Sequence, residues 1–379
     1  MITLEFLESL DYSELVMLYS QLNIELTQDI IEQIENGKDI SEMSKNEFNK
    51  FVERIGAIIF ASALLKISKL NTSVKKELKN TYTEMAKDNM KSYKKLFEYR
   101  GLKYEVSNDQ LKILNRAVKK SSTELANFTK TIAFSSQKAY VEAIDKAYLD
   151  VLTGKNYINA IDNTVRELAG KGITLTDSAG RQVQLEVAVR RNILSGIKLT
   201  ADDINKIIER KLGCNGYTVP AHSGARPSHA EAQGKQYAIT KSNAKKYNVG
   251  FWGDVKHLWK EYNCRHTPTG IILGISEPLY TDEELEELKN SKVTYKGKKI
   301  SEYEATQIQR RLEREQRNLK RQLQPLKNSN DNIKDEELKQ KQEKTIKNLQ
   351  TRLTKKQKEY KIFCNETGLT PQCERTKVI

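Results

Sequence analysis

Residues 218–234 read TVPAHSGARPSHAEAQG, and residues 263–274 read NCRHTPTGIILG. All four histidines of the chain and both of its tryptophans lie in or between these two segments: His222, His229, His257, His266, Trp252 and Trp259. The surrounding sequence alternates short apolar runs with glycine and proline, which is typical of short strands and helices joined by loops. The stretch from Tyr217 to Leu285 therefore predicts a small α+β unit that concentrates the residues able to carry chemistry.

Local signals place several elements in this unit. Tyr217 begins a candidate strand, and Ser228 with Glu231 has the spacing of a capping box, which predicts a helix directly after Pro227 with His229 in its first turn. A second capping box at Thr281 and Glu284 predicts a helix over residues 282–288. The run from Val293 to Ile300 predicts a β-hairpin that turns at Gly297.

The chain before this unit is predicted to be helical. Residues 1–213 contain no proline, the commonest helix breaker. Apolar residues three and four apart, such as Phe51, Ile55 and Ile59, indicate helices with one buried stripe. Gly154 is predicted to end a helix, and β-branched residues around an Asp-Ser-Ala-Gly cluster predict a hairpin at 172–183. A helix is expected over 185–197, and Thr200 with Asp203 predicts the start of another that ends at Gly213.

The chain after this unit is rich in Lys, Gln, Glu and Leu. Two leucine-containing stripes, separated by Pro325 and the polar run 328–332, predict two antiparallel helices joined by a turn. Their apolar seam is sparse and their flanks are basic. We therefore expect a hairpin that projects from the protein and is not part of a buried core.

These observations predict an α+β fold that is predominantly α-helical. We expect a helical N-terminal region at 1–121, with an acidic part at 1–50 and a basic part at 66–120. A helical region with a short hairpin follows at 122–213, then the small α+β unit at 214–302 and the basic helical hairpin with a C-terminal tail at 303–379. No run of eighteen apolar residues occurs, so no membrane association is expected.

Charge is unevenly distributed along the chain. The net charge is +14, yet residues 1–50 carry −8, whereas residues 66–120 and 307–361 carry +9 each. Basic blocks of this kind suit a polyanion such as double-stranded DNA, because neutralising phosphates releases counterions. The same lysines can also serve only to solvate helix faces.

The histidines and cysteines suggest a zinc site, because both are standard zinc ligands. His229, Cys264 and His266 are the candidate ligands, with His222 or Cys214 as a fourth. The sequence lacks a C-x-x-C or H-x-x-x-H pair, and C-x-H is short for a zinc finger. We therefore predict no metal and no cofactor. Instead, we expect a structural motif in which arginines bond carbonyls or carboxylates and histidines bridge loops; its members are His222, Arg226, His229, Gly234, Cys264, Arg265 and His266.

Enzymatic activity is not expected either. Cys264 with His229 or His222 as base is the remaining nucleophilic arrangement, but the sequence supplies no evident oxyanion site or pair of acid–base carboxylates. Neither of the glycine-rich phosphate-binding patterns occurs.

The paired blocks R-P-S-H-A and N-C-R-H closely resemble the phage minor capsid protein 2 family. They are also similar to the wider head-morphogenesis family of tailed phages, in which the last residue of the second block is cysteine where this chain has His266. The resemblance extends over roughly residues 130–379. It implies a structural protein of the phage head that is made in the host cytoplasm and resides in the virion in multiple copies. Its partners would be other head proteins, namely the portal or the major capsid protein.

We therefore predict a non-enzymatic minor capsid protein that links head components and contacts packaged DNA. Two alternatives remain open from the sequence. One is a nucleic-acid-binding protein without sequence preference and without a capsid role. The other is a metal- or cysteine-dependent hydrolase or toxin-like domain.

Overall fold

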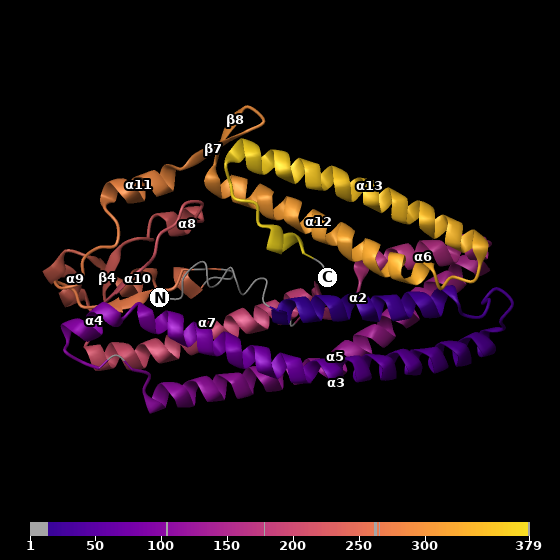
Figure 1. Ribbon diagram of the computed structural model, residues 1–379, viewed down its shortest axis with the longest axis horizontal. Coiled ribbons are helices and arrows are strands. Elements are labelled where there is room, and N and C mark those ends of the chain that lie inside the picture. Colours follow the sequence, from indigo (N-terminus) through magenta and orange to yellow (C-terminus); the bar gives the residue numbers. More distant parts are fainter. Residues whose placement is uncertain (1–13, 104, 178, 261–263, 265, 378–379) are drawn as a thin grey trace.

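The structure is a computed structural model that describes residues 14–103, 105–177, 179–260, 264 and 266–377 (Figure 1). Long helices make up most of it, and the strands form small sheets, which confirms the predicted fold class. Five helices build an elongated body: α2 (Glu14–Glu35), α3 (Lys45–Lys91), α5 (Asn108–Leu152), α6 (Tyr157–Lys171) and α7 (Leu185–Leu212).

The body is held together by one continuous apolar core. Tyr19 and Ile30 of α2, Leu78 of α3, Tyr140 of α5 and Ile197 of α7 are all fully buried in it. Each comes from a stripe of apolar residues three and four apart, so each helix presents one face to its neighbours. Because α2 supplies part of this core, residues 14–35 of the acidic N-terminal region are an integral part of the body.

Capping explains where the long helices begin and end. Ser44 with Glu47 and Ser107 with Gln110 form complete capping boxes at the starts of α3 and α5. Gly154 follows the end of α5 as predicted, and Gly213 closes α7 in the left-handed conformation. The proposed division of the chain into four regions stays a prediction; residue 121, at the first boundary, lies inside α5.

The helix start predicted at Thr200 is wrong. α7 runs without interruption from Leu185 to Leu212, and the Thr200 hydroxyl donates to the carbonyl of Gly196 one turn earlier. Asp203 pairs with Lys206 at 3.0 Å and does not cap a helix. The hairpin predicted before α7 is confirmed, with β1 (Thr174–Thr176) antiparallel to β2 (Gln182–Gln184).

A four-stranded sheet in the order β5-β4-β3-β6 lies at one end of the body. Its strands are β3 (Gly216–Thr218), β4 (Gln236–Ala238), β5 (Gly250–Phe251) and β6 (Thr269–Ile271), and only β4 and β5 are parallel. Short helices connect them: α8 (Pro227–Ala230), α9 (Lys241–Tyr247), α10 (Trp252–Val255) and η1 (Leu258–Lys260).

Tyr93, which lies between α3 and α4 (Lys94–Tyr99), ties this sheet to the body. Its hydroxyl donates to Glu209 of α7 at 3.0 Å and accepts from the backbone N–H of Gly270 in β6 at 3.3 Å. Burial is the main cause that raises the pKa of both Tyr93 and Glu209. Because these buried groups bond to one another and not to water, they fix the position of the sheet relative to the helices.

The segment after the sheet contains α11 (Asp282–Asn290) and a hairpin of β7 (Lys292–Tyr295) and β8 (Lys298–Ser301). Both were predicted, and the Thr281–Glu284 capping box is complete. The hairpin turn uses Lys296 and Gly297, both with positive φ. This conformation suits the right-handed twist of a two-residue hairpin.

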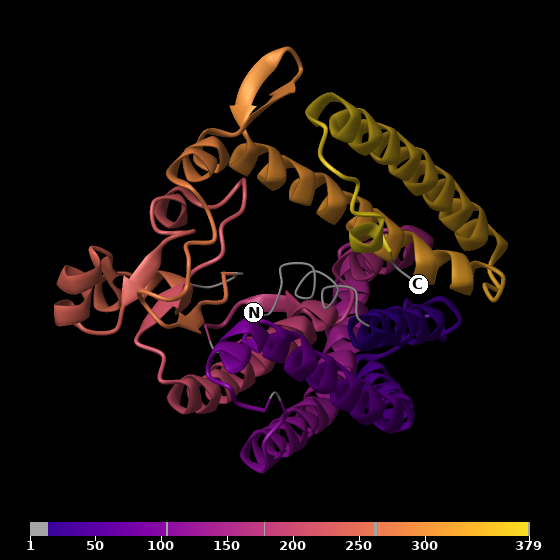
Figure 2. The same ribbon diagram turned by 60° about the vertical axis from the view of Figure 1, so that its left-hand side comes forward.

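Two long antiparallel helices, α12 (Glu302–Asn330) and α13 (Glu336–Thr367), form the C-terminal hairpin, followed by η2 (Cys373–Thr376). Pro325 lies inside α12 and does not end it. The prediction that the hairpin projects away from the core is wrong for its turn end, because Leu319, Leu323 and Leu326 belong to the main core beside α2 and α6. Both views show this end of the hairpin against the body (Figures 1 and 2).

The other end of the hairpin has a small apolar core of its own. Ala305, Leu312, Tyr360 and Phe363 are buried there, with Val293 and Tyr295 of β7 packed against them. No helix in the described part of the chain is long and apolar enough to cross a membrane.

Candidate functional site

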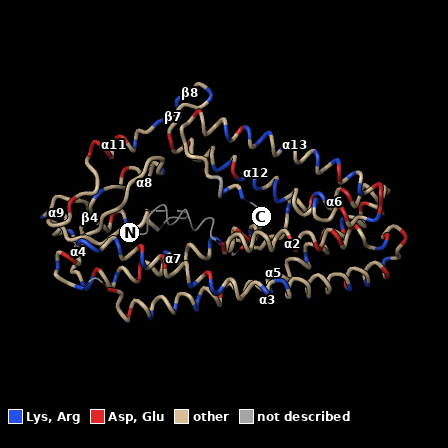
Figure 3. Tube along the Cα trace, viewed as in Figure 1, with Lys and Arg blue, Asp and Glu red and all other residues tan. Residues whose placement is uncertain are grey.

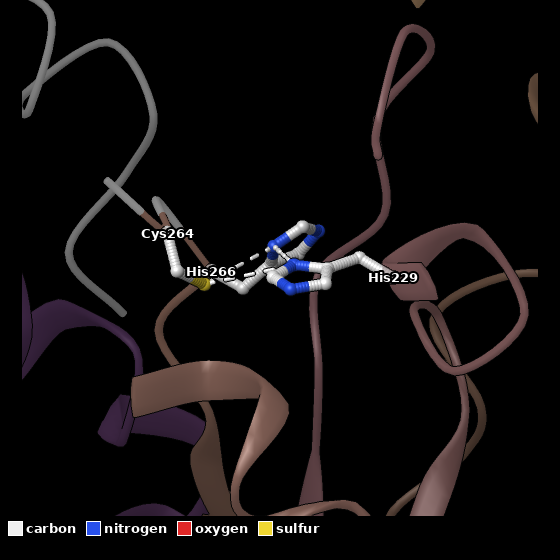
Figure 4. Close-up of side chains that lie close together, drawn as sticks. All are labelled: His229, Cys264 and His266. Atoms are coloured by element: carbon white, nitrogen blue, oxygen red, sulfur yellow. Dashed lines mark hydrogen bonds between the residues drawn. The ribbon is translucent and has the colours of Figure 1, made fainter. Parts of the chain in front are cut away.

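Three of the predicted motif residues, His229, Cys264 and His266, meet beside the four-stranded sheet (Figure 4). The pairing of β3 with both β4 and β6 creates this meeting point, with Thr218 opposite both Gln236 and Thr269. The chain that leaves β3 and the chain that enters β6 therefore lie side by side.

His229 is placed by α8. Pro227 is the first residue of this short helix, where its missing N–H costs nothing, and the N–H of His229 bonds the carbonyl of Arg226 at 2.9 Å. The predicted capping box of Ser228 with Glu231 is wrong, because α8 is capped by the backbone of Arg226 and ends at Ala230. The position predicted for His229, in the first turn, is nevertheless correct, and its side chain is only 1% exposed.

His266 is oriented by Gln233. The Gln233 amide donates from Nε2 to the carbonyl of His222 at 3.0 Å, and its Oε1 accepts from the N–H of His222 at 3.2 Å. This fixes Oε1 as the atom 3.0 Å from Nε2 of His266. Because an amide oxygen only accepts, the ring carries its proton on Nε2 and its lone pair on Nδ1.

The electrostatic environment keeps His266 neutral. Burial, together with the nearby His222, His229, Lys198 and Arg226, lowers the pKa of His266 to about 3. The ring therefore has no charge at neutral pH, and its Nδ1 lone pair remains available.

Cys264 completes a compact group with the two histidines. Its Sγ lies 3.6 Å from Nδ1 of His266 and 3.8 Å from Nδ1 of His229, and the two Nδ1 atoms are 3.4 Å apart. Figure 4 shows the three side chains pointing toward one another. The sequence named these three residues as possible ligands, and the structure brings them together.

Besides Gln233, sequence reasoning did not assign Trp259 and Lys198 to the site. Trp259 is 2% exposed, and its ring centre lies 5.0 Å from that of His266 and 5.4 Å from that of His229. The carbonyl of Trp259 accepts a hydrogen bond from Lys198 of α7, which links the site to the body. The tryptophan stood in the segment singled out from the sequence, but nothing in the sequence marks Lys198.

The other predicted residues take different places. The His222 ring stacks on His266 with 4.8 Å between ring centres, and Arg226 is half-buried next to α8. His257 is exposed, and Cys214 packs beside the main core, where burial raises the pKa of its thiol to about 12. The prediction for Arg265 falls on a residue outside the described part of the chain.

Gly234 serves the motif through its backbone. It has φ +76°, and a Cβ there would overlap Leu285 of α11. Its N–H bonds the carbonyl of Val219 at 3.0 Å, directly beyond the end of β3. Only glycine combines this backbone conformation with such close packing.

Comparison with known protein families identifies the kind of protein that contains this site. The sequence pattern described as phage minor capsid protein 2 matches residues 7–365, which is nearly the whole chain. The chain belongs to the phage minor capsid protein 2 family. No curated protein and no solved structure matches it.

Membership of this family confirms the resemblance found in the motif blocks and extends it to the N-terminal helices. A minor capsid protein has a structural role in the phage, belongs to the virion and interacts with other components of the particle. In this minor capsid protein, His229 and His266 of the motif are buried, and the neighbouring Trp259 is linked to α7 by Lys198.

The geometry also bears on whether Cys264 can act as a nucleophile. Cys264 has a histidine nitrogen within 4 Å on two sides. His229, one of the two bases named from the sequence, has Nδ1 3.8 Å from Sγ. His266, which is nearer, is a poor base for a thiol because the pKa of its imidazole is lowered to about 3. The arrangement places three electron-pair donors, one from each of these side chains, around a single point.

Proposed function

We propose that this minor capsid protein is a non-enzymatic structural protein that links components of the phage head and lies against packaged DNA. Family membership supports the structural role. The observation that carries the DNA contact is the distribution of charge on α13 (Figure 3). The proposed protein partner is the portal or the major capsid protein, with several copies of this chain in each particle.

The exposed face of α13 carries a row of basic side chains, here called the α13 basic surface: Lys344, Lys347, Arg352, Lys355, Lys358 and Lys361. At 100° per residue these side chains spread over about half of the helix circumference, opposite the buried Leu349 and Tyr360. They extend along about 25 Å of helix axis. Such a row can contact several phosphates of one duplex without reading its sequence.

A second charged surface lies on α11, at some distance from α13 (Figure 3). The acidic residues of this helix are all exposed: Asp282, Glu283, Glu284, Glu286 and Glu287. In contrast, α2 directs most of its acidic residues into contacts within the protein: Asp29 pairs with Lys66 at 2.8 Å, and Glu35 is buried, although Glu14 is exposed. We therefore place the docking of a head protein on α11, where opposite charge can steer and orient a partner.

DNA binding is expected to be independent of sequence and to weaken steeply with salt. With about five phosphates neutralised, log affinity against log salt should have a slope of roughly −4 to −5. Replacing Lys355, Lys358 and Lys361 together by glutamine should reduce that slope by about three. Fluorescence anisotropy with a short duplex at about 50–200 mM salt measures both quantities.

The matched control replaces three exposed lysines of the other basic stretch, Lys75, Lys76 and Lys79 on α3, by glutamine. It should leave the slope unchanged. The α13 assignment fails if the control lowers the slope and the α13 variant does not. Absence of measurable affinity at low salt would mean that these lysines only solvate their helices.

Head association is expected to depend on α11. The protein should co-purify with assembled heads in fewer copies than the major shell protein, and the double substitution Glu283→Lys and Glu287→Lys should reduce its copy number several-fold. Quantitative mass spectrometry of purified heads measures this ratio. The α13 triple variant is the control and should be incorporated normally. Heads that contain none of the wild-type protein, while the free protein coats DNA, would favour the nucleic-acid-binding alternative.

A further inference from the structure

The three donor atoms of the motif have the spacing of a metal coordination shell. Zinc bonds of about 2.0–2.1 Å to nitrogen and about 2.3 Å to sulfur, at tetrahedral angles, separate two nitrogens by about 3.4 Å and a nitrogen and sulfur by about 3.6 Å. The observed separations are 3.4 Å for the two Nδ1 atoms and 3.6 and 3.8 Å from Sγ to each of them. All three separations agree with those expected between three ligand atoms on one face of a tetrahedral zinc site.

Hydrogen bonds within the group explain part of this arrangement. The thiol can donate to Nδ1 of His266, and Sγ can accept from Nδ1 of His229. The Nδ1–Nδ1 separation of 3.4 Å is longer than the usual range for a nitrogen donor and acceptor, so a hydrogen bond does not explain it. A cation bound to the three electron pairs accounts for all three separations together.

The surroundings of His266 are those of a metal ligand. Its Nε2–H donates to Gln233 Oε1 at 3.0 Å, and the Gln233 amide is itself held by the backbone of His222. A hydrogen bond from the far nitrogen of a ligating imidazole fixes the tautomer and turns the lone pair toward the metal. Trp259 packs against both histidine rings and limits the access of water.

We propose that Nδ1 of His229, Sγ of Cys264 and Nδ1 of His266 bind one zinc ion, as three of its four ligands. Two imidazoles and a thiolate are a ligand set that suits zinc. On binding, the thiol of Cys264 loses its proton to solvent and coordinates as a thiolate. This site differs from the expectation drawn from sequence spacing, because its ligands come from two segments that only the folded sheet brings together.

The role of this zinc is structural. It joins α8, which carries His229, to the segment that leads into β6, which carries Cys264 and His266. Trp259, which packs against both histidine rings, is in turn tied to α7 by the hydrogen bond from Lys198 to its carbonyl. The ion would therefore hold the motif against the helical body. This role does not depend on which surface binds the capsid partner or DNA.

The test is the metal content of the full-length protein, purified under reducing conditions without a polyhistidine tag. Elemental analysis should find about one zinc per chain. Replacing zinc by Co²⁺ should produce the intense visible bands of tetrahedral cobalt and an absorption from thiolate-to-cobalt charge transfer. Removal of zinc from the wild-type protein by a chelator should lower its Tm, and added zinc should restore it.

Matched variants locate the site. Cys264→Ala should lose the zinc and the thiolate band, whereas Cys214→Ala and His257→Ala should keep both. Gln233→Leu should retain zinc but bind it about 10–100-fold more weakly, because His266 loses its orienting partner. Circular dichroism checks that each variant is folded. A wild-type protein that holds no zinc and takes up neither zinc nor Co²⁺, or full zinc retention in folded Cys264→Ala, would overturn the proposal.

Discussion

Replacing Leu326 by alanine is expected to lower the free energy of unfolding by about 2–5 kcal/mol. Leu326 lies near the end of α12 and is 1% exposed, packed into the main core beside α2 and α6. The substitution removes buried methyl groups and leaves a cavity that rigid neighbouring helices cannot fill. Chemical denaturation followed by circular dichroism measures the loss.

The control is Ile362→Ala on α13, where the side chain is 46% exposed. Its effect should stay within about 0.5 kcal/mol. If Leu326→Ala is equally mild, the C-terminal hairpin is not part of the core in solution. If the hairpin unfolds at a lower denaturant concentration than the remainder of the protein, the two parts unfold independently.

The prediction of a projecting hairpin failed for an identifiable reason. The seam of α12 and α13 is sparse because polar residues occupy part of the buried face. Gln342 bonds both the carbonyl of Leu326 and the hydroxyl of Ser329 at 3.0 Å, so these groups are satisfied without water. A buried, fully bonded polar group has the same sequence signature as an exposed one, and only the structure distinguishes them.

Elements governed by neighbours in sequence were predicted well. The capping box at Thr281, the turn at Gly297 and the hairpin before α7 depend on residues a few positions apart, and the structure contains all three. The false start at Thr200 shows the limit of such signals. The apolar stripe continues through Ile197, Ile204 and Ile208, and the burial of this stripe outweighs a local capping pattern.

The candidate site was predictable in its residue types but not in its geometry. His229 and Cys264 are 35 positions apart, and their approach depends on the pairing of β3 with β6. Ligand spacing within one loop, as in a zinc finger, could not reveal such a group. Gln233 was part of the quoted block, yet its role depends on a backbone contact with His222 that no sequence pattern encodes.

Glu35 is expected to make the stability of the protein fall as the pH rises. It ends α2 and is 6% exposed, beside Ser329 of α12 and Gln342 of α13. The pKa of its carboxyl is raised from 4.5 to about 8, mainly by burial; the charges of Glu32 and Asp162 contribute to the rise, and hydrogen bonds with Ser329 and Gln342 oppose it. The folded protein therefore holds a proton that the unfolded chain releases above pH 4.5.

The sign follows from this difference in proton binding. Below pH 4.5 the carboxyl is protonated in both states, so Glu35 imposes no electrostatic cost on folding. Between pH 4.5 and about 8 only the unfolded state has lost the proton, so unfolding becomes progressively more favourable. Above that window the accumulated loss is constant, at roughly 3–5 kcal/mol.

Glu35→Gln keeps the size and the neutral polar character of the side chain but cannot ionise. We expect it to match the wild-type protein in stability near pH 4 and to exceed it by roughly 3–5 kcal/mol near pH 9. Denaturation curves at several pH values measure the difference. Glu32→Gln, one turn earlier on α2 and half-buried, is the control and should retain most of the decline, because burial is the main cause of the raised pKa of Glu35. If wild type and Glu35→Gln lose stability in parallel as the pH rises, the carboxyl of Glu35 is not buried in solution, and the docking of α12 and α13 onto the end of α2 is wrong.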